Sequence, residues 1–171
     1  MKKLLLVLII GFALGTSAFA DHPGFGIGII GGWGWPSHGY AGLSLKVPKV
    51  PIFWGIYPVF AGHSFGIGAT GDFYFIDNSL VNTKMTNEDG TYNFKLDWYL
   101  GLGAFFNMYF WDGGMNAGVG LRVPIGLSWH IIRQLELLLD FAPGIGISFN
   151  GGGVWGPYWA GAIELGLRFW M

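Results

Sequence analysis

The stretch "MNAGVGLRVPIGLSWHI", residues 115–131, alternates between large apolar residues and small or polar ones along its whole length. The odd-numbered positions carry the apolar set, which is Met115, Ala117, Val119, Leu121, Val123, Ile125, Leu127, Trp129 and Ile131. The even-numbered positions carry Asn116, Gly118, Gly120, Arg122, Pro124, Gly126, Ser128 and His130. A period of two residues indicates a β-strand with one apolar and one polar face. The strand is longer than the roughly 3–10 residues that are usual in soluble proteins.

The beginning of the chain has the pattern of a secretory signal peptide. Two lysines precede an apolar core over 4–14, and Ala-Phe-Ala at 18–20 fits the small-x-small rule for cleavage. The apolar core is much shorter than the roughly 20 residues that a membrane-spanning helix needs. We therefore predict a cleavable signal peptide over 1–20 and one β-barrel domain over 21–171.

The composition is apolar without being helical. Hydrophobic residues make up 52% of the chain and charged residues only 11%, which is too few for the polar surface of a soluble domain. The 31 glycines and 8 prolines interrupt every apolar stretch that follows the predicted signal peptide, so none of them could cross a bilayer as a helix. An exported, glycine-rich, apolar chain of this kind favours a closed β-barrel in an outer membrane.

Charge and cysteine content exclude several classes of function. Without the two lysines of the predicted signal peptide the chain has seven basic and ten acidic residues. It has no basic patch, so we expect no nucleic-acid partner. The chain has no cysteine, which excludes disulfides and thiolate metal sites.

Eight stretches are predicted as strands, most of them from the same alternation. They cover 24–33, 39–47, 51–61, 64–76, 93–111, 115–131, 135–149 and 158–171. The stretch 51–61 is the weakest, because it is apolar on both faces and carries two prolines, and it is assigned as a strand because its neighbours need one. Bacterial single-chain barrels have an even number of strands. The predicted fold is therefore all-β, an eight-stranded antiparallel up-and-down transmembrane β-barrel.

One predicted connection is unusually long. Residues 77–92, "DNSLVNTKMTNEDGTY", are polar and contain the turn signal Asp89-Gly90. An even strand count places both termini in the periplasm and puts this connection on the same side, where turns are usually short. Either the barrel has one long periplasmic turn, or one early strand is miscounted.

Three segments of the chain resemble a known family. The runs "GVGLRVPIGLSW", "LELLLDFAPGIGISF" and "GAIELGLRFW" are similar to the C-terminal half of small spirochaete-type outer-membrane barrels, whose architecture is that of OmpA and OmpX. The closing aromatic residues resemble the terminal signal for barrel assembly, although Trp170 and Met171 follow Phe169. The resemblance implies a location in the bacterial outer membrane, with membrane lipid and the barrel-assembly machinery as partners. It implies no chemistry, and a ligand of extracellular loops stays open.

Arg122 is explained by the narrow lumen of an eight-stranded barrel, which side chains fill. Strand parity points nine charged residues inward: Lys46, Asp72, Lys95, Asp97, Arg122, Glu136, Asp140, Glu164 and Arg168. Four are basic and five are acidic, and buried charges must be paired. We therefore expect Arg122 to pair with a carboxylate such as Asp140 or Glu164. Pro124 is expected at a bulge or at the rim, where no ladder N–H is needed.

Two chemical sites are conceivable from the residue types alone. Ser128, His130 and Glu136 could form a Ser-His-Glu hydrolase, but same-face neighbours lie about 7 Å apart and no oxyanion donors are evident. We expect a hydrogen-bond network there, and neither catalysis nor a cofactor. His38 and His63 could bind a metal if their loops met, although ordinary loop histidines and no metal site are expected.

Two functions follow from this sequence. The first is a small outer-membrane barrel with a filled polar lumen and a structural or surface-interaction role. The alternative is a narrow OmpW-like channel for small solutes or hydrophobic molecules, which the many inward glycines keep open. On the first interpretation Leu121→Arg is costly, because Leu121 faces lipid, and Gly120→Ser on the inner face is milder.

Overall fold

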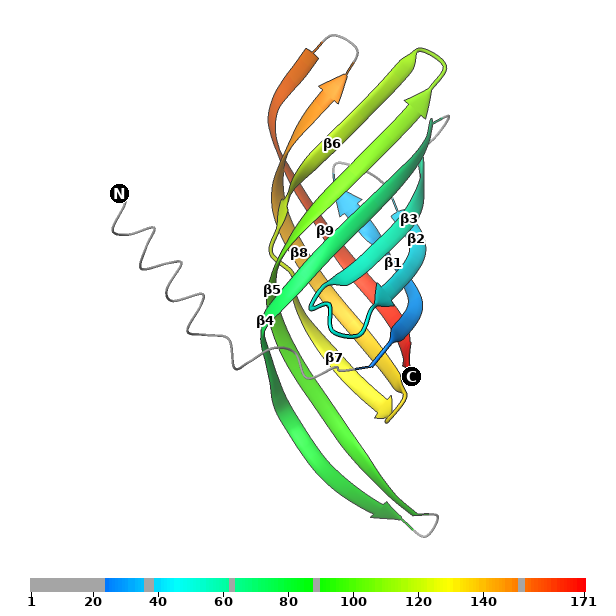
Figure 1. The fold of residues 1–171 in the computed structure, drawn as a ribbon, viewed down its shortest axis with the longest axis vertical. Helices are drawn as coiled ribbons and strands as arrows, with labels where there is room; N and C mark the ends of the chain where they lie inside the picture. The colour runs from blue at the N-terminus through cyan, green and yellow to red at the C-terminus, as the bar shows by residue number, and fades with distance from the viewer. Residues whose placement is uncertain (1–23, 36–38, 62–63, 88–89, 151–152) are drawn as a thin grey trace, which may run out of the picture.

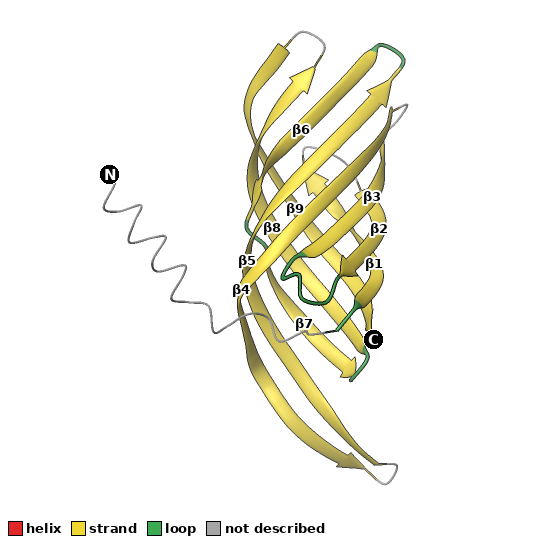
Figure 2. Ribbon diagram, viewed as in Figure 1, coloured by secondary structure: helices red, strands yellow, loops and turns green. Residues whose placement is uncertain are grey.

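In the computed structural model, which describes residues 24–35, 39–61, 64–87, 90–150 and 153–171, the regular structure is entirely β (Figures 1 and 2). The predicted signal peptide over 1–20 lies outside the described residues. No helix in the described ranges is long and apolar enough to cross a membrane. The strands are β1 (Gly26–Trp35), β2 (Gly39–Lys46), β3 (Phe53–Ala61), β4 (Ser64–Asn87), β5 (Gly90–Trp111), β6 (Gly114–Arg122), β7 (Ile125–Ile132), β8 (Leu135–Asn150) and β9 (Gly153–Trp170).

The strands form one antiparallel sheet that closes on itself. The order is β4-β3-β2-β1-β9-β8, and β6 and β7 then share the place between β8 and β5, which pairs back to β4. The first and last strands close the ring along their length, from the pair Gly26 and Trp170 to the pair Trp35 and Gly161. Counting β6 and β7 as one position, the ring has eight members. The prediction of an all-β antiparallel fold is confirmed, and the weakest predicted strand, 51–61, is present as β3.

Pro124 divides the stretch 115–131 into β6 and β7. Proline has no N–H to give to the ladder, so regular pairing stops at this position. The backbone still bonds to both neighbours, because the Val123 N–H donates to the Pro143 carbonyl at 2.8 Å and the Gly101 N–H donates to the Pro124 carbonyl at 2.8 Å. Pro124 is fully buried in the middle of the ring. Of the two expected positions, a bulge or the rim, the rim is wrong, because the interruption of pairing lies inside one continuous wall.

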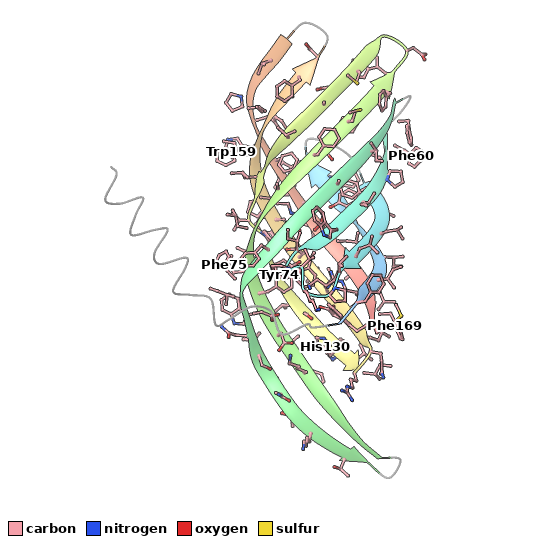
Figure 3. All side chains as sticks on the ribbon, in the orientation of Figure 1. Phe60, Tyr74, Phe75, His130, Trp159 and Phe169 are labelled. Carbon is pink, nitrogen blue, oxygen red and sulfur yellow. The ribbon has the colours of Figure 1, made fainter. Side chains whose placement is uncertain are left out.

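Exposure alternates along the strands with the expected parity. Leu121 is 58% exposed, whereas its neighbour Arg122 is buried. Figure 3 shows Phe60 and Trp159 on the outer face, where they are 66% and 78% exposed. The outside of the ring is therefore apolar and the inside holds the charges, which inverts the usual arrangement of a water-soluble protein.

The expected loop over 77–92 is instead a long two-stranded hairpin. β4 continues to Asn87 and β5 begins at Gly90, with pairs such as Lys84 opposite Asn93. β3 accompanies β4 only as far as Asp72, so the hairpin extends beyond the ring at the end that carries the C-terminus (Figure 1). The loop prediction was wrong because backbone pairing needs no apolar face, and this ladder has exposed side chains. The strand count is not at fault, since the ring has eight members.

Aromatic side chains in the interior lie close against glycines of nearby strands. A Cβ atom added at Gly120 or Gly146 would come within 2.5 Å or 2.8 Å of the Phe105 ring. A Cβ atom at Gly68 would lie 2.1 Å from the Tyr57 ring. These positions need glycine because the aromatic side chains approach the backbone too closely for a Cβ atom. The missing Cβ atoms leave room for the large side chains inside the narrow closed sheet.

Gly120→Ser is therefore expected to cost more than face parity alone predicts, although still less than Leu121→Arg. The new Cβ would lie 2.3 Å from the Ile145 carbonyl oxygen as well as against Phe105. Overpacking of this kind costs about 1–3 kcal/mol of unfolding free energy. The matched control is Gly156→Ser, because nothing lies within 4 Å of a Cβ added there. Urea titration of the two variants checks the difference, and equal stability would contradict the packing described.

Candidate functional site

The interior charges gather into two clusters and a rim group, except for Lys46, whose ammonium group donates to the Val47 carbonyl at 3.1 Å. Of the nine residues that parity points inward, the structure buries Lys46, Asp72, Asp97, Arg122, Glu136, Asp140, Glu164 and Arg168. The exception is Lys95, whose side chain is 37% exposed and which lies 2.9 Å from the Asp97 carboxylate. Lys95 therefore belongs to the rim rather than to the buried interior.

The first cluster is centred on the Arg122 guanidinium, which contacts three carboxylates. Its Nε lies 3.1 Å from Asp72 Oδ1. Its two Nη atoms donate to both oxygens of Glu164, at 3.1 Å and 2.5 Å. The second Nη also donates to Asp140 Oδ2 at 3.4 Å. Both partners named from the sequence, Asp140 and Glu164, are therefore in place.

Asp72 is the partner that the sequence did not single out. It faces Gly103 on β5, and Gly103 faces Arg122 on β6, so the ion pair spans a strand that has no side chain at that level. A Cβ at residue 103 would lie 1.9 Å from Asp72 Oδ1. Parity placed Asp72 on the inner face, but only the registers of two successive ladders bring it to Arg122.

The cluster carries more negative than positive formal charge. Asp140 and Glu164 lie directly opposite each other on β8 and β9, an arrangement that is repulsive without a cation between them. Arg122 supplies that cation, and the Tyr40 hydroxyl donates a further hydrogen bond to Glu164. Arg122 is thus the group that allows three carboxylates to be buried together.

The second cluster lies nearer the end of the ring that carries the C-terminus. Glu136 precedes Asp140 by four residues on β8, and Arg168 follows Glu164 by four residues on β9. Arg168 Nη1 donates to Glu136 Oε2 at 2.9 Å, and Arg168 Nη2 donates to the Ser44 hydroxyl at 2.9 Å. The Trp170 indole N–H donates to the same Glu136 oxygen at 2.8 Å. The Arg168 guanidinium also lies 4.7 Å from the centre of the Phe53 ring, within the range of a cation–π contact.

The space between the two clusters is filled. Phe53, Tyr74 and Tyr99 stack across β3, β4 and β5 with ring centroids 4.4 Å and 4.3 Å apart. Asp72 and Arg168, one from each cluster, line the same void, whose volume is only about 10 Å³. Such a void holds about one water molecule. This void between the two clusters is therefore too small for a solute larger than water.

The conceivable Ser-His-Glu site has a different geometry from that of a hydrolase. The Ser128 hydroxyl donates to Glu136 Oε1 at 2.6 Å, which ties the serine to the Arg168 cluster. His130 Nδ1 lies 3.6 Å from the Asp97 carboxylate, on the rim side. His130 also lies directly opposite Glu136 in the β7–β8 ladder, as expected from the sequence, but the Ser128 hydroxyl is bonded to the carboxylate itself.

Neither a group of metal ligands among the described residues nor a related protein assigns a role to this site. Within the described ranges, no three His, Cys, Asp or Glu side chains are grouped to hold a metal ion. His38 and His63 lie outside the described residues. No family of known proteins, no curated protein and no solved structure matches this chain. The fold and the site together define the class of this protein as a closed eight-stranded antiparallel ring with a charged, packed interior and an apolar exterior.

Proposed function

We propose that the chain is an integral outer-membrane β-barrel with a filled interior and a structural or surface-interaction role. The observation that carries the proposal is the inverted distribution of polarity, with apolar side chains exposed around the ring and ion pairs inside. Soluble monomers rarely expose contiguous apolar patches beyond a few hundred Å². A closed ring satisfies every strand edge, which is the condition for β-structure in lipid.

A narrow channel of the OmpW type is the second candidate. It is favoured by a cavity of about 250 Å³ inside the end of the ring away from the C-terminus. The Arg122 cluster and the packed region behind it lie between this cavity and the other end. We therefore favour the filled barrel, and a conducting path would require these side chains to move.

The proposed membrane orientation places the long β4–β5 hairpin in the periplasm. Outer-membrane barrels with an even number of strands have both termini on that side. The C-terminus and the hairpin lie at the same end of the ring (Figure 1). Of the two explanations for the long connection, this orientation corresponds to one long periplasmic extension.

Fractionation tests the proposed location. We expect the full chain, expressed in a Gram-negative host, to sediment with the outer membrane and to stay there after extraction with alkaline carbonate. We also expect it to migrate differently on gels when it is heated, because closed barrels resist unfolding by detergent. Release into the soluble fraction by carbonate would overturn the proposal, and a helix-dominated circular dichroism spectrum would overturn the fold.

A further inference from the structure

The cavity above Arg122 has walls suited to a ligand. Its volume is about 250 Å³, below the roughly 300–1,000 Å³ typical of sites for drug-sized molecules. An occupant would therefore be no larger than about one six-membered ring with its substituents. Seven of the eight positions in the ring, all except β4, contribute residues to the wall, so the cavity depends on closure of the sheet.

Aromatic rings and amides supply most of the chemistry of the wall. Tyr40 and Tyr57 stack with ring centroids 4.2 Å apart, and Phe105 packs edge-on against Tyr158 at 6.4 Å. All four line the cavity. These rings offer apolar surface to an occupant, and the tyrosine hydroxyls offer hydrogen bonds.

Two asparagines add fixed polar groups to this wall. Asn107 Oδ1 accepts a hydrogen bond from the Tyr57 hydroxyl at 3.4 Å. Asn116 Oδ1 is buried and has no hydrogen-bond partner in the described part of the structure. A buried amide oxygen without a partner costs stability, so it favours an occupant that brings a donor.

The charge at the floor of the cavity selects against ions. Among the described residues that line it, Arg122 is the one that carries a charge. Three carboxylates, Asp72, Glu164 and Asp140, already surround its guanidinium within 3.4 Å, so an anion would meet a positive charge that is already compensated and would be repelled by the carboxylates. A cation would be repelled by the positively charged Arg122 guanidinium, which is the part of the cluster that lines the cavity. The wall therefore fits a neutral molecule with apolar faces and a rim of donors and acceptors.

We propose that this cavity is a binding site for a neutral ligand the size of one sugar ring. A pyranose has C–H faces that pack against aromatic rings and hydroxyl groups that bond to amides. Asn116 accepts a hydrogen bond from such a hydroxyl, and the Tyr40–Tyr57 pair covers one face of the sugar. This inference goes beyond the proposed function, because it depends on the closed sheet and its cavity and not on whether the sheet conducts solutes.

Binding is tested with N-acetyl-D-glucosamine as the probe. The full chain is purified in a polyoxyethylene detergent, because maltoside or amine-oxide headgroups would compete with the probe. Titration is followed by NMR chemical shifts of side-chain amides. We expect saturation at probe concentrations up to about 10 mM, the range of weak small-ligand affinities.

Two substitutions locate the binding in the cavity. Asn116→Leu removes the acceptor and is expected to weaken the affinity for the probe at least tenfold, whereas Asn82→Leu, at an exposed position on the β4–β5 hairpin, leaves it unchanged. Ser148→Phe fills the cavity from β8 and is expected to abolish binding, which keeps the test decisive if Asn116→Leu fails to fold.

Three results would overturn the proposal. The first is no saturation of the wild-type chain by the probe, which would mean that the cavity holds only water. The second is saturation that both cavity variants leave unchanged, which would place binding elsewhere. The third is binding of tetramethylammonium in preference to the sugar, which would make the aromatic wall a cage for cations.

Discussion

Arg122→Ala is expected to destabilise the protein by about 3–5 kcal/mol, because it leaves three buried carboxylates without their cation. Asp140 and Glu164 would then face each other directly across β8 and β9, with Asp72 beside them. Urea unfolding of the protein in lipid vesicles measures the loss. Arg133→Ala, in the exposed turn after β7, is the matched control and should change stability little.

A double-mutant cycle separates loss of the ion pairs from loss of packing. Adding Glu164→Gln to Arg122→Ala removes one uncompensated charge and keeps an acceptor for the Tyr40 hydroxyl. We expect the double variant to recover part of the stability that Arg122→Ala loses, giving a coupling energy between the two sites. If the protein is instead a narrow channel, Arg122→Ala is expected to keep wild-type stability and to raise the conductance in planar bilayers. That pair of results would replace the filled barrel with a pore.

Leu121→Arg is expected to cost about 2–4 kcal/mol if Leu121 lies near the middle of a bilayer, because a charged side chain on the outer face would be placed in lipid. The chain offers a close control in Leu80→Arg. Leu121 is 58% exposed and Leu80 is 55% exposed, but Leu80 lies on the hairpin beyond the ring. The two leucines thus differ in location and hardly at all in exposure.

The comparison of these two variants distinguishes lipid from water around the ring. In lipid vesicles we expect Leu121→Arg to shift the urea midpoint strongly and Leu80→Arg to leave it near wild type. If the ring were surrounded by water, both exposed leucines would accept arginine at little cost. Equal behaviour of the two variants would therefore contradict the proposed membrane location.

Local pattern was sufficient for the strands and for the direction of their side chains. Successive side chains of a strand point to opposite faces, so the alternation around Leu121 and Arg122 could be predicted without knowing any neighbour. The same rule placed Asp72 and Glu164 inside. It failed for 77–92, where both faces are exposed and the alternating signal is absent.

The sequence by itself thus determined an all-β chain, the number of positions in its ring and the inner set of charges except for Lys95, which lies at the rim. Only the tertiary structure decided which charges meet, because contacts across the ring depend on register, which is the sum of several ladders and turns. Asp72 reaches Arg122 over Gly103 by two such registers. The cavity between Arg122 and Asn116 was decided in the same way, because its wall exists only when distant strands close into one ring.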